Sequence, residues 1–385
     1  MIHPRLAAVL AAAIAAAALT TQPLTASAAV PARPAPVHGT TTGAVFVQTD
    51  DPRHNAVIAF DRGADGRLTR SANYSTGGKG AALDGAVVDP LASQGSLTLD
   101  RAHDLLYAVN GGSDTLTVFA VRGSLLQRLQ VLPTHGDVPV SVSVSGSLVY
   151  VLNARSGGSI SGYRVIGDHL IPLAGSTRSL GLVPNANPEF LQTPSQVAVT
   201  PDGSAVVVAT KTHGKLLVFP LNGGRPSTSP VVTKSGTVPF ALSFDRAGRL
   251  LVVDATGFAT AYRVRPDGGV REVSSIGPTG QQAACWTVVV RGTLYAANAG
   301  SNTISSFGIR GGTLTIKQAV AAHTDGGPVD LAASRHGRYL YQLSGATGVI
   351  DEFRVDRDGT LTSIGTVDTG LGAASGHALE GIAAS

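Results

Sequence analysis

A unit of about 45 residues recurs along this chain, and the repeat limits what the chain can fold into. Short turns that precede an apolar run lie at His103, Gly146, Gly203, Gly248, Gly292 and Gly337. Their spacings are 43, 57, 45, 44 and 45 residues. A recurring unit of about 40 to 50 residues with four short apolar runs is typical of a β-propeller blade. The sequence therefore predicts an all-β protein made of four-stranded antiparallel blades.

The clearest unit has its first predicted strand at Trp286 to Val290. Its other three runs are Thr293 to Ala297, Thr303 to Ile309 and Thr313 to Val320, each bounded by turn-forming Gly, Asn, Asp or Ser. The same pattern begins again at Ser96, Val140, Ser195, Pro239 and Gly327. These units predict six complete blades, with no helix.

A seventh blade is predicted from the two ends of the repeat region. Residues 43–75 supply only three strands, and residues 376–385 supply a lone last strand. Pairing that strand with the first three closes the ring and removes an open sheet edge. We therefore predict one seven-bladed propeller over residues 43–385. The spacing of 57 residues adds a loop insertion at about 178–194.

The first 42 residues do not follow the repeat. A basic start, an apolar run from Leu6 to Leu19 and Ala26-Ser27-Ala28 predict a signal peptide over residues 1–28. A membrane anchor is the alternative interpretation, but it needs about 20 apolar residues. Residues 29–42, which are rich in proline, predict an extended linker. We expect a secreted, extracellular protein with no membrane span, and its single Cys285 excludes an internal disulfide.

Composition excludes one class of partner. The formal net charge is only +4, and the basic residues form no run that would attract nucleic acid. Aromatic residues make up 5% of the chain, which is few for stacking on bases. We expect no nucleic-acid partner, and a ligand that is a small molecule, a carbohydrate or a protein.

Several motifs resemble one family of propellers. They are Thr200-Pro201-Asp202-Gly203, Ala283-Ala284-Cys285-Trp286 and the segment from Asn298 to Phe307. With these motifs the chain resembles the lactonase-like seven-bladed propellers, a superfamily that includes 6-phosphogluconolactonases and carboxymuconate cycloisomerases, and in particular its secreted bacterial branch. The resemblance implies the fold and a site at the channel mouth.

The resemblance also implies a set of catalytic groups, which this sequence lacks. The family uses a His and an Arg-His pair where innermost strands begin, and a Glu that follows an Asn. The matching positions here are Ser195-Gln196, Phe240-Ala241 and Asp254-Ala255. Only four glutamates are present, and of these Glu380 alone stands at the start of an innermost strand. Lactone hydrolysis therefore needs other groups.

We expect the loops between blades, and those between the second and third strands of a blade, to form one face, called here the mouth face. Its candidate binding residues are His135, Asp137, Asn153, Arg155, His213, Asp254, His323, Asp325 and His377. Asn and Asp after a strand are also typical turn caps. No cofactor is predicted, although His and carboxylate groups that converge there would suit a divalent cation.

Asp330 and Glu380 are the candidate catalytic acids, since both stand where innermost strands begin. Hydrogen-bonded channel groups are the alternative interpretation. The other positions at the strand starts are mostly small, including Ser141, Ala241, Cys285 and Gly381. We interpret Cys285 as a buried, inert thiol.

Two hypotheses of function follow. The first is a secreted propeller that binds a ligand or partner at its mouth face and has not retained the family's catalytic groups. The second is a divergent lactone hydrolase or cycloisomerase that uses Asp330, Glu380 and histidines of the mouth face.

Overall fold

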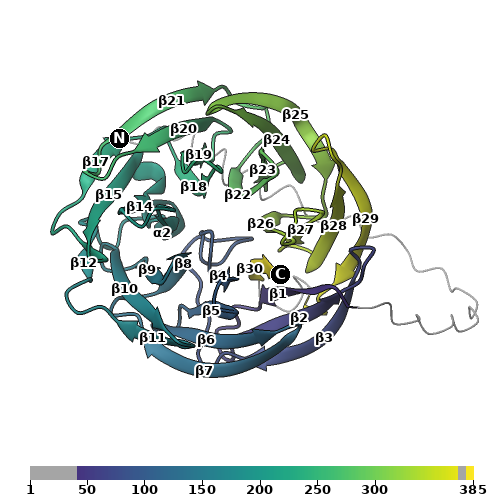
Figure 1. Ribbon diagram of the computed structural model, residues 1–385, viewed down its shortest axis with the longest axis horizontal. Helices are drawn as coiled ribbons and strands as arrows, with labels where there is room; N and C mark the ends of the chain where they lie inside the picture. Colours follow the sequence, from purple (N-terminus) through teal and green to yellow (C-terminus); the bar gives the residue numbers. More distant parts are fainter. Residues whose placement is uncertain (1–40, 372–378) are drawn as a thin grey trace, which may run out of the picture.

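The computed structural model describes residues 41–371 and 379–385, which form a ring of seven β-sheets around a central axis (Figure 1). Each sheet has four antiparallel strands, in sequence order from the axis outward except that the last strand is innermost in the first blade, and two sheets have a short extra strand. The predicted all-β seven-bladed propeller is confirmed. The signal peptide, most of the linker and His377 lie outside the described residues.

The first blade is built from both ends of the propeller. Its strands are β30 (Glu380–Ala384), β1 (Gly43–Gln48), β2 (Ala56–Arg62) and β3 (Leu68–Ser75). β30 is the innermost strand and pairs antiparallel with β1, so that Phe46 faces Ala383 and Val47 faces Ile382. The predicted ring closure is confirmed.

Blades 2 to 4 follow in sequence. Blade 2 contains β4 (Leu97–Asp100), β5 (Leu105–Asn110), β6 (Thr115–Arg122) and β7 (Leu125–Pro133). Blade 3 contains β8 (Pro139–Ser145), β9 (Leu148–Asn153), β10 (Ser159–Ile166), β11 (His169–Pro172) and β12 (Arg178–Ser179). Blade 4 contains β13 (Gln196–Val199), β14 (Ala205–Ala209), β15 (Lys215–Asn222), β16 (Arg225–Pro226) and β17 (Val231–Lys234).

Blades 5 to 7 complete the ring. Blade 5 contains β18 (Pro239–Phe244), β19 (Leu250–Asp254), β20 (Ala259–Val264) and β21 (Val270–Ile276). Blade 6 contains β22 (Ala284–Val290), β23 (Thr293–Asn298), β24 (Thr303–Arg310) and β25 (Thr313–His323). Blade 7 contains β26 (Pro328–Ala333), β27 (Tyr339–Ser344), β28 (Val349–Val355) and β29 (Leu361–Asp368).

The core lies between the blades. The second strands, such as β5 and β23, are buried along their whole length because they are covered on both faces by neighbouring sheets. The outer strands alternate between exposed and half-buried residues, as in β7 and β29. With Cys285 a buried free thiol, packing and strand pairing hold the ring together.

The expectation of a chain without helix was wrong at two short segments. The insertion at 178–194 contains α2 (Glu189–Gln192), a single turn, and a 3₁₀ turn, η1, lies at Lys211–His213. Pro188 precedes α2 at the N-cap position, and Pro194 lies two residues after its last residue. Proline is tolerated at the start of a helix and stops its continuation.

Candidate ligand-binding channel

The innermost strands of all seven blades enclose a central channel of about 830 Å³. At one end the lining consists of the exposed residues Arg101, Arg291 and Arg335, which lie in turns that join first and second strands. We call this side of the ring the opposite face, because it is opposite the mouth face. At the other end the lining is Gln94 and Asp330, both buried. The channel is therefore open at the opposite face and closed toward the mouth face.

A short segment of the connection between blades 1 and 2 closes the channel. These residues, 89–96, are called here the plug segment. The carbonyl of Ser93 accepts a hydrogen bond of 2.8 Å from the Trp286 indole, and its hydroxyl donates to the Val140 carbonyl at 2.8 Å. The Gln94 N–H donates to the Ser195 carbonyl at 3.2 Å. The plug segment is thus bonded to blades 3, 4 and 6.

The small residues where the innermost strands begin make room for the plug segment. A Cβ on Gly381 would lie 2.2 Å from Ser96 Oγ, and Gly381 has φ +77°, which favours glycine. The hydroxyl of Ser141 donates to the Gln94 carbonyl at 2.7 Å. The sequence showed these positions to be small, but nothing in the repeat pattern pointed to the segment that covers them.

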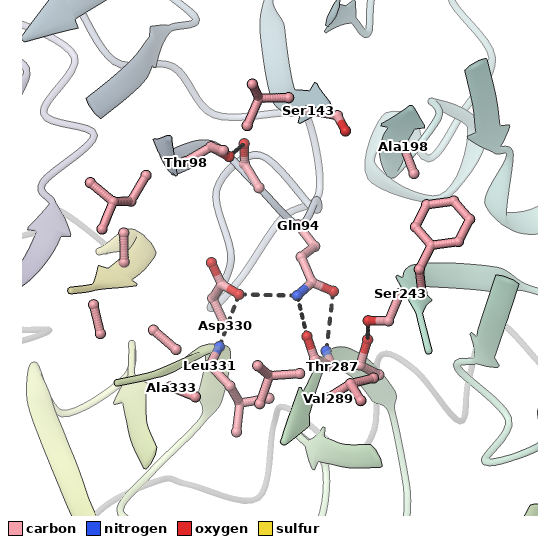
Figure 2. Close-up of a pocket in the computed structure, with 18 of the residues that line it drawn as sticks. Gln94, Thr98, Ser143, Ala198, Ser243, Thr287, Val289, Asp330, Leu331 and Ala333 are labelled. Atoms are coloured by element: carbon pink, nitrogen blue, oxygen red, sulfur yellow. Dashed lines mark hydrogen bonds between the residues drawn. The ribbon is translucent and has the colours of Figure 1, made fainter. Parts of the chain in front are cut away.

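Gln94 forms the closed end of the channel (Figure 2). Its Nε2 donates to the Thr287 carbonyl at 2.7 Å and to Asp330 Oδ1 at 3.3 Å, and its Oε1 accepts from the Thr287 N–H at 3.1 Å. Every polar atom of this side-chain amide therefore has a partner, which allows it to remain buried.

Asp330, one of the two predicted catalytic acids, lies beside Gln94. Its carboxylate accepts hydrogen bonds from the N–H groups of Leu331 at 2.9 Å and Ile382 at 3.2 Å. Burial raises the pKa of Asp330 to about 7, although these hydrogen bonds lower it. Asp330 thus links blades 7 and 1 and the plug segment, and its protonation changes near neutral pH.

Glu380, the second predicted acid, lies under the plug segment. Its carboxyl group accepts hydrogen bonds from the Leu91 N–H at 3.4 Å and the Ser93 hydroxyl at 3.5 Å, and both it and the neighbouring Asp89 are buried. Burial and the negative charge of Asp89 raise the pKa of Glu380, since two adjacent carboxylates cannot both ionise readily. Lys211, also buried, donates from Nζ to the Ala92 carbonyl and to Thr193 Oγ1, each at 3.0 Å. This cluster fastens the plug segment to the insertion and to blade 1.

Polar side chains connect neighbouring innermost strands along the channel wall. The Thr98 hydroxyl donates to the Val142 carbonyl at 2.9 Å, and Ser143 Oγ accepts from the Val199 N–H at 2.9 Å. The hydroxyls of Ser243 and Thr287 share a hydrogen bond of 2.7 Å. Because a hydroxyl has one donor and two acceptor positions, these groups can also bond to a ligand.

The mouth face is covered by the insertion. Arg155 donates from Nε and Nη2 to the two carboxylate oxygens of Glu189 at 2.6 and 2.9 Å, and the Asp84 N–H donates to the same carboxylate at 2.8 Å. The hydrogen bond to Arg155 lowers the pKa of Glu189. The predicted binding residue Arg155 is therefore engaged within the protein.

Two predicted binding residues are turn caps. Asp254 is buried and accepts hydrogen bonds from the N–H groups of Thr237, Val238 and Thr256 at 2.8, 2.6 and 2.9 Å. Asn153, also buried, donates to Ser159 Oγ at 3.1 Å. These are the turn-cap roles that Asp and Asn often have after a strand.

The remaining predicted residues lie apart on the mouth face. His135 stacks on Tyr163 with 6.5 Å between ring centroids, and a ring nitrogen of His213 lies 2.9 Å from the Gln192 carbonyl. Asp137 accepts from the Ser156 hydroxyl, and the Asp325 N–H donates to Asp351 at 3.2 Å. His323 is exposed at the end of β25. Within the described ranges, no three His, Cys, Asp or Glu side chains are arranged to hold a metal ion.

The geometry defines the class: a seven-bladed propeller whose central channel is closed at one end. The family model for the lactonases, described as a seven-bladed β-propeller, matches residues 14–168. The match covers less than half of the chain, and it agrees with the resemblance that the sequence motifs indicated. No curated protein matches the chain.

Solved structures share the fold at low identity. The periplasmic gluconolactonase PpgL of Pseudomonas aeruginosa is 20% identical, with a TM-score of 0.66 over 89% of this chain and 98% of that chain. A protein of Lactobacillus plantarum is 18% identical, with a TM-score of 0.68 over 89% and 99%. The β-propeller domain of Myceliophteria thermophila Cps50 is 10% identical, with a TM-score of 0.55 over 83% and 100%. These similarities establish the fold and leave the activity to be argued from the site.

In the described part of the chain, no helix has the length and apolar character needed to span a bilayer.

Proposed function

We propose that this protein is an exported propeller that binds a small molecule in its central channel, which the ligand enters from the opposite face. The observation that carries the proposal is the channel itself: about 830 Å³, open at one end and lined with apolar side chains among which hydroxyl and amide groups are placed. Concave sites of about 300 to 1,000 Å³ with a few placed polar groups are typical of small-molecule binding.

The mouth face is a weaker candidate for the ligand-binding site than the channel. Its cationic group Arg155 is paired with Glu189, and Asp254 and Asn153 hold turns. The plug segment fills the position where the family resemblance implies a catalytic site. A ligand entering from the mouth face would have to displace residues 89–96 and their hydrogen bonds to three blades.

The positions that replace the family's catalytic groups favour binding over catalysis. The Ser195 hydroxyl donates to the Phe240 carbonyl at 2.8 Å, and Phe240 packs edge-on against Trp286 with 5.4 Å between ring centroids. These side chains are buried and serve packing.

Blocking the channel tests the proposal. Val289 lines the channel and is partly exposed to it, so Val289→Trp would fill much of the space. Val232→Trp, on the exposed outer strand β17, is the matched control. We expect isothermal titration with D-gluconate, glucose 6-phosphate and D-glucitol to detect binding to the parent protein and to Val232→Trp, and none to Val289→Trp. Equal binding by both variants would contradict the proposal.

Lactone hydrolysis is a second candidate, favoured by one observation. Asp330 is a carboxyl group at the closed end of the channel whose pKa is about 7, a value suited to proton transfer near neutral pH. Turnover of δ-gluconolactone, measured with and without a chelator, tests this candidate. Activity that is lost in both Asp330→Asn and Glu380→Gln would support it, and activity unchanged in both would exclude these residues.

The proposal also includes export from the cell. It rests on the basic start, the apolar run and the small residues before position 29. We expect protein recovered from the culture medium to begin at Ala29 when its N-terminus is sequenced. A mature protein that still carries residues 1–28 would contradict cleavage.

A further inference from the structure

Three arginines stand at the open end of the channel. Arg101 follows β4, Arg291 follows β22 and Arg335 follows β26, so they come from blades 2, 6 and 7. All three are exposed, and across residues 41–371 and 379–385 none of them forms a salt bridge with an acidic side chain.

Some arginines at the outer edge of the same face have acidic partners, since Arg265 lies 3.2 Å from Asp267 and Arg354 lies 2.9 Å from Asp356. Others, such as Arg310, form no salt bridge with any described residue. At the channel entrance, three arginines from three blades stand together without an acidic partner, which leaves a local excess of positive charge there.

Arg101 is held in place across the entrance. Its Nη2 donates to the carbonyls of Ala384 at 2.6 Å and Ala333 at 2.8 Å, so the side chain reaches from blade 2 past blade 1 to blade 7. Partial burial and the positive charge of Arg335 lower the pKa of Arg101. An anion that binds both guanidinium groups would reduce the repulsion between their like charges.

The rest of the channel offers little competing negative charge. Among the described residues that line it, Asp330 is the single acid, and it lies at the closed end with its oxygens already accepting hydrogen bonds. Between the two ends lie hydroxyl and amide groups, including Thr98, Ser143 and Ser243.

We infer that the channel binds a small organic anion, a carboxylate or a phosphate ester, whose charged group lies on Arg101 and Arg335. Its remainder extends along the hydroxyls of Thr98, Ser143 and Ser243. Guanidinium groups bind both kinds of anion through paired, charge-assisted hydrogen bonds. The inference rests on the proposed function and adds the chemical class of the ligand.

Isothermal titration with three probes tests the inference. D-gluconate carries a carboxylate, glucose 6-phosphate carries a phosphate, and D-glucitol is an uncharged polyol of similar size. We expect at least one anion to bind ten-fold or more tightly than glucitol, and the tighter anion indicates which group the arginines select. Affinity for that anion should fall as salt is added, because added ions screen exposed charges.

Charge-removing variants locate the site. Arg101→Gln and Arg335→Gln should each weaken binding of the tighter anion ten-fold or more. Arg265→Gln removes the same charge from the same face outside the channel, and should change affinity less than two-fold. Melting temperatures of the three variants verify that they remain folded.

The failure of each proposal gives a different result. Glucitol binding as tightly as both anions, or equal losses in Arg101→Gln and Arg265→Gln, would overturn the anion inference and leave the channel proposal standing. Anion binding that is lost in Arg101→Gln yet unchanged in Val289→Trp would contradict the channel proposal. The absence of binding by either anion would overturn the inference.

Discussion

The side-chain amide of Gln94 and the backbone of Thr287 form two hydrogen bonds of 2.7 and 3.1 Å across the central axis of the ring. The amide thus bonds to β22 as the backbone of a neighbouring strand would. It joins the loop that precedes blade 2 to blade 6, which is not its neighbour in the ring. Both residues are buried, so a polar group that loses its partner there costs free energy.

Replacing Gln94 should destabilise the fold more than replacing a similar glutamine elsewhere. Gln94→Ala leaves the Thr287 N–H and carbonyl without partners in a buried place, and we expect the free energy of unfolding to fall by about 2 to 4 kcal/mol. Gln130 makes the same two-way pair with Leu170 on an outer strand and is half-buried. Gln130→Ala is therefore the control, with a loss below about 1 kcal/mol. Urea unfolding measures both, and equal losses would contradict the role of Gln94.

Packing of the plug segment on β30 can be tested at one glycine. Gly381 and Gly292 have φ of +77° and +79°, but only at Gly381 would an added Cβ meet other atoms closely. We expect Gly292→Ala to lower the free energy of unfolding by about 1 kcal/mol through backbone strain. Gly381→Ala adds the clash with Ser96 to the same strain, so its loss should exceed that of Gly292→Ala by about 2 kcal/mol or more. Thermal unfolding of the two variants measures the difference; similar melting temperatures would show that residues 89–96 do not pack against β30 in this way.

Stability should depend on pH through Asp330. Its pKa is about 7 in the folded protein and about 3.9 in an unfolded chain, so between about pH 4 and pH 7 the folded state retains a proton that the unfolded state has lost. The stabilisation from this proton is complete below about pH 4 and is lost as the pH rises to about 7. Over this range the free energy of unfolding should fall by up to about 1.4 kcal/mol per pH unit.

Asp330→Asn isolates this contribution. Burial also raises the pKa of Glu352 to about 7 and that of Asp351 to about 6, so the parent protein reports several groups together. The variant should show a smaller decrease in unfolding free energy between pH 4 and pH 7, measured by denaturant titration at each pH. Identical pH profiles for variant and parent would contradict the titration of Asp330 in this range.

Ring closure predicts that the last strand can be supplied separately. A chain that lacks residues 376–385 leaves β1 without its inner partner and exposes an open edge. We expect a lower melting temperature for this chain, and its recovery when a peptide of residues 376–385 is added. A peptide in which Ile382 is changed to Asp is the control, because Ile382 is buried. An unchanged melting temperature after truncation would contradict the closure.

The repeat predicted the fold closely, because strand and turn patterns are local. The four runs that begin with Trp286 to Val290 correspond to β22, β23, β24 and β25, with small differences at their ends. The split first blade was also predictable, since an unpaired last strand and a three-stranded sheet complete each other. The single turn α2 was missed because four residues between prolines carry no helical period.

The site was predicted less well, because it depends on contacts between distant segments. The repeat placed Asp330 and Glu380 where innermost strands begin, but residues 89–96 lie in a connection that follows no repeat pattern. Their burial, and with it the closed end of the channel, arises from bonds to residues such as Val140 and Trp286. The cluster of arginines at the open end could not be predicted either, since the sequence around a turn in one blade does not indicate which residues of another blade lie next to it.

The pairing of β1 with β30 also has a kinetic consequence. The two strands are separated by more than 330 residues, so their contact has a very large sequence separation, and closing such a long loop costs conformational entropy. In a chain that is synthesised from its N-terminus, blade 1 remains a three-stranded sheet until every other blade has emerged. Completion of the ring should therefore be the slow final event of folding, and the period before it is when the exposed edge of β1 can pair with another chain.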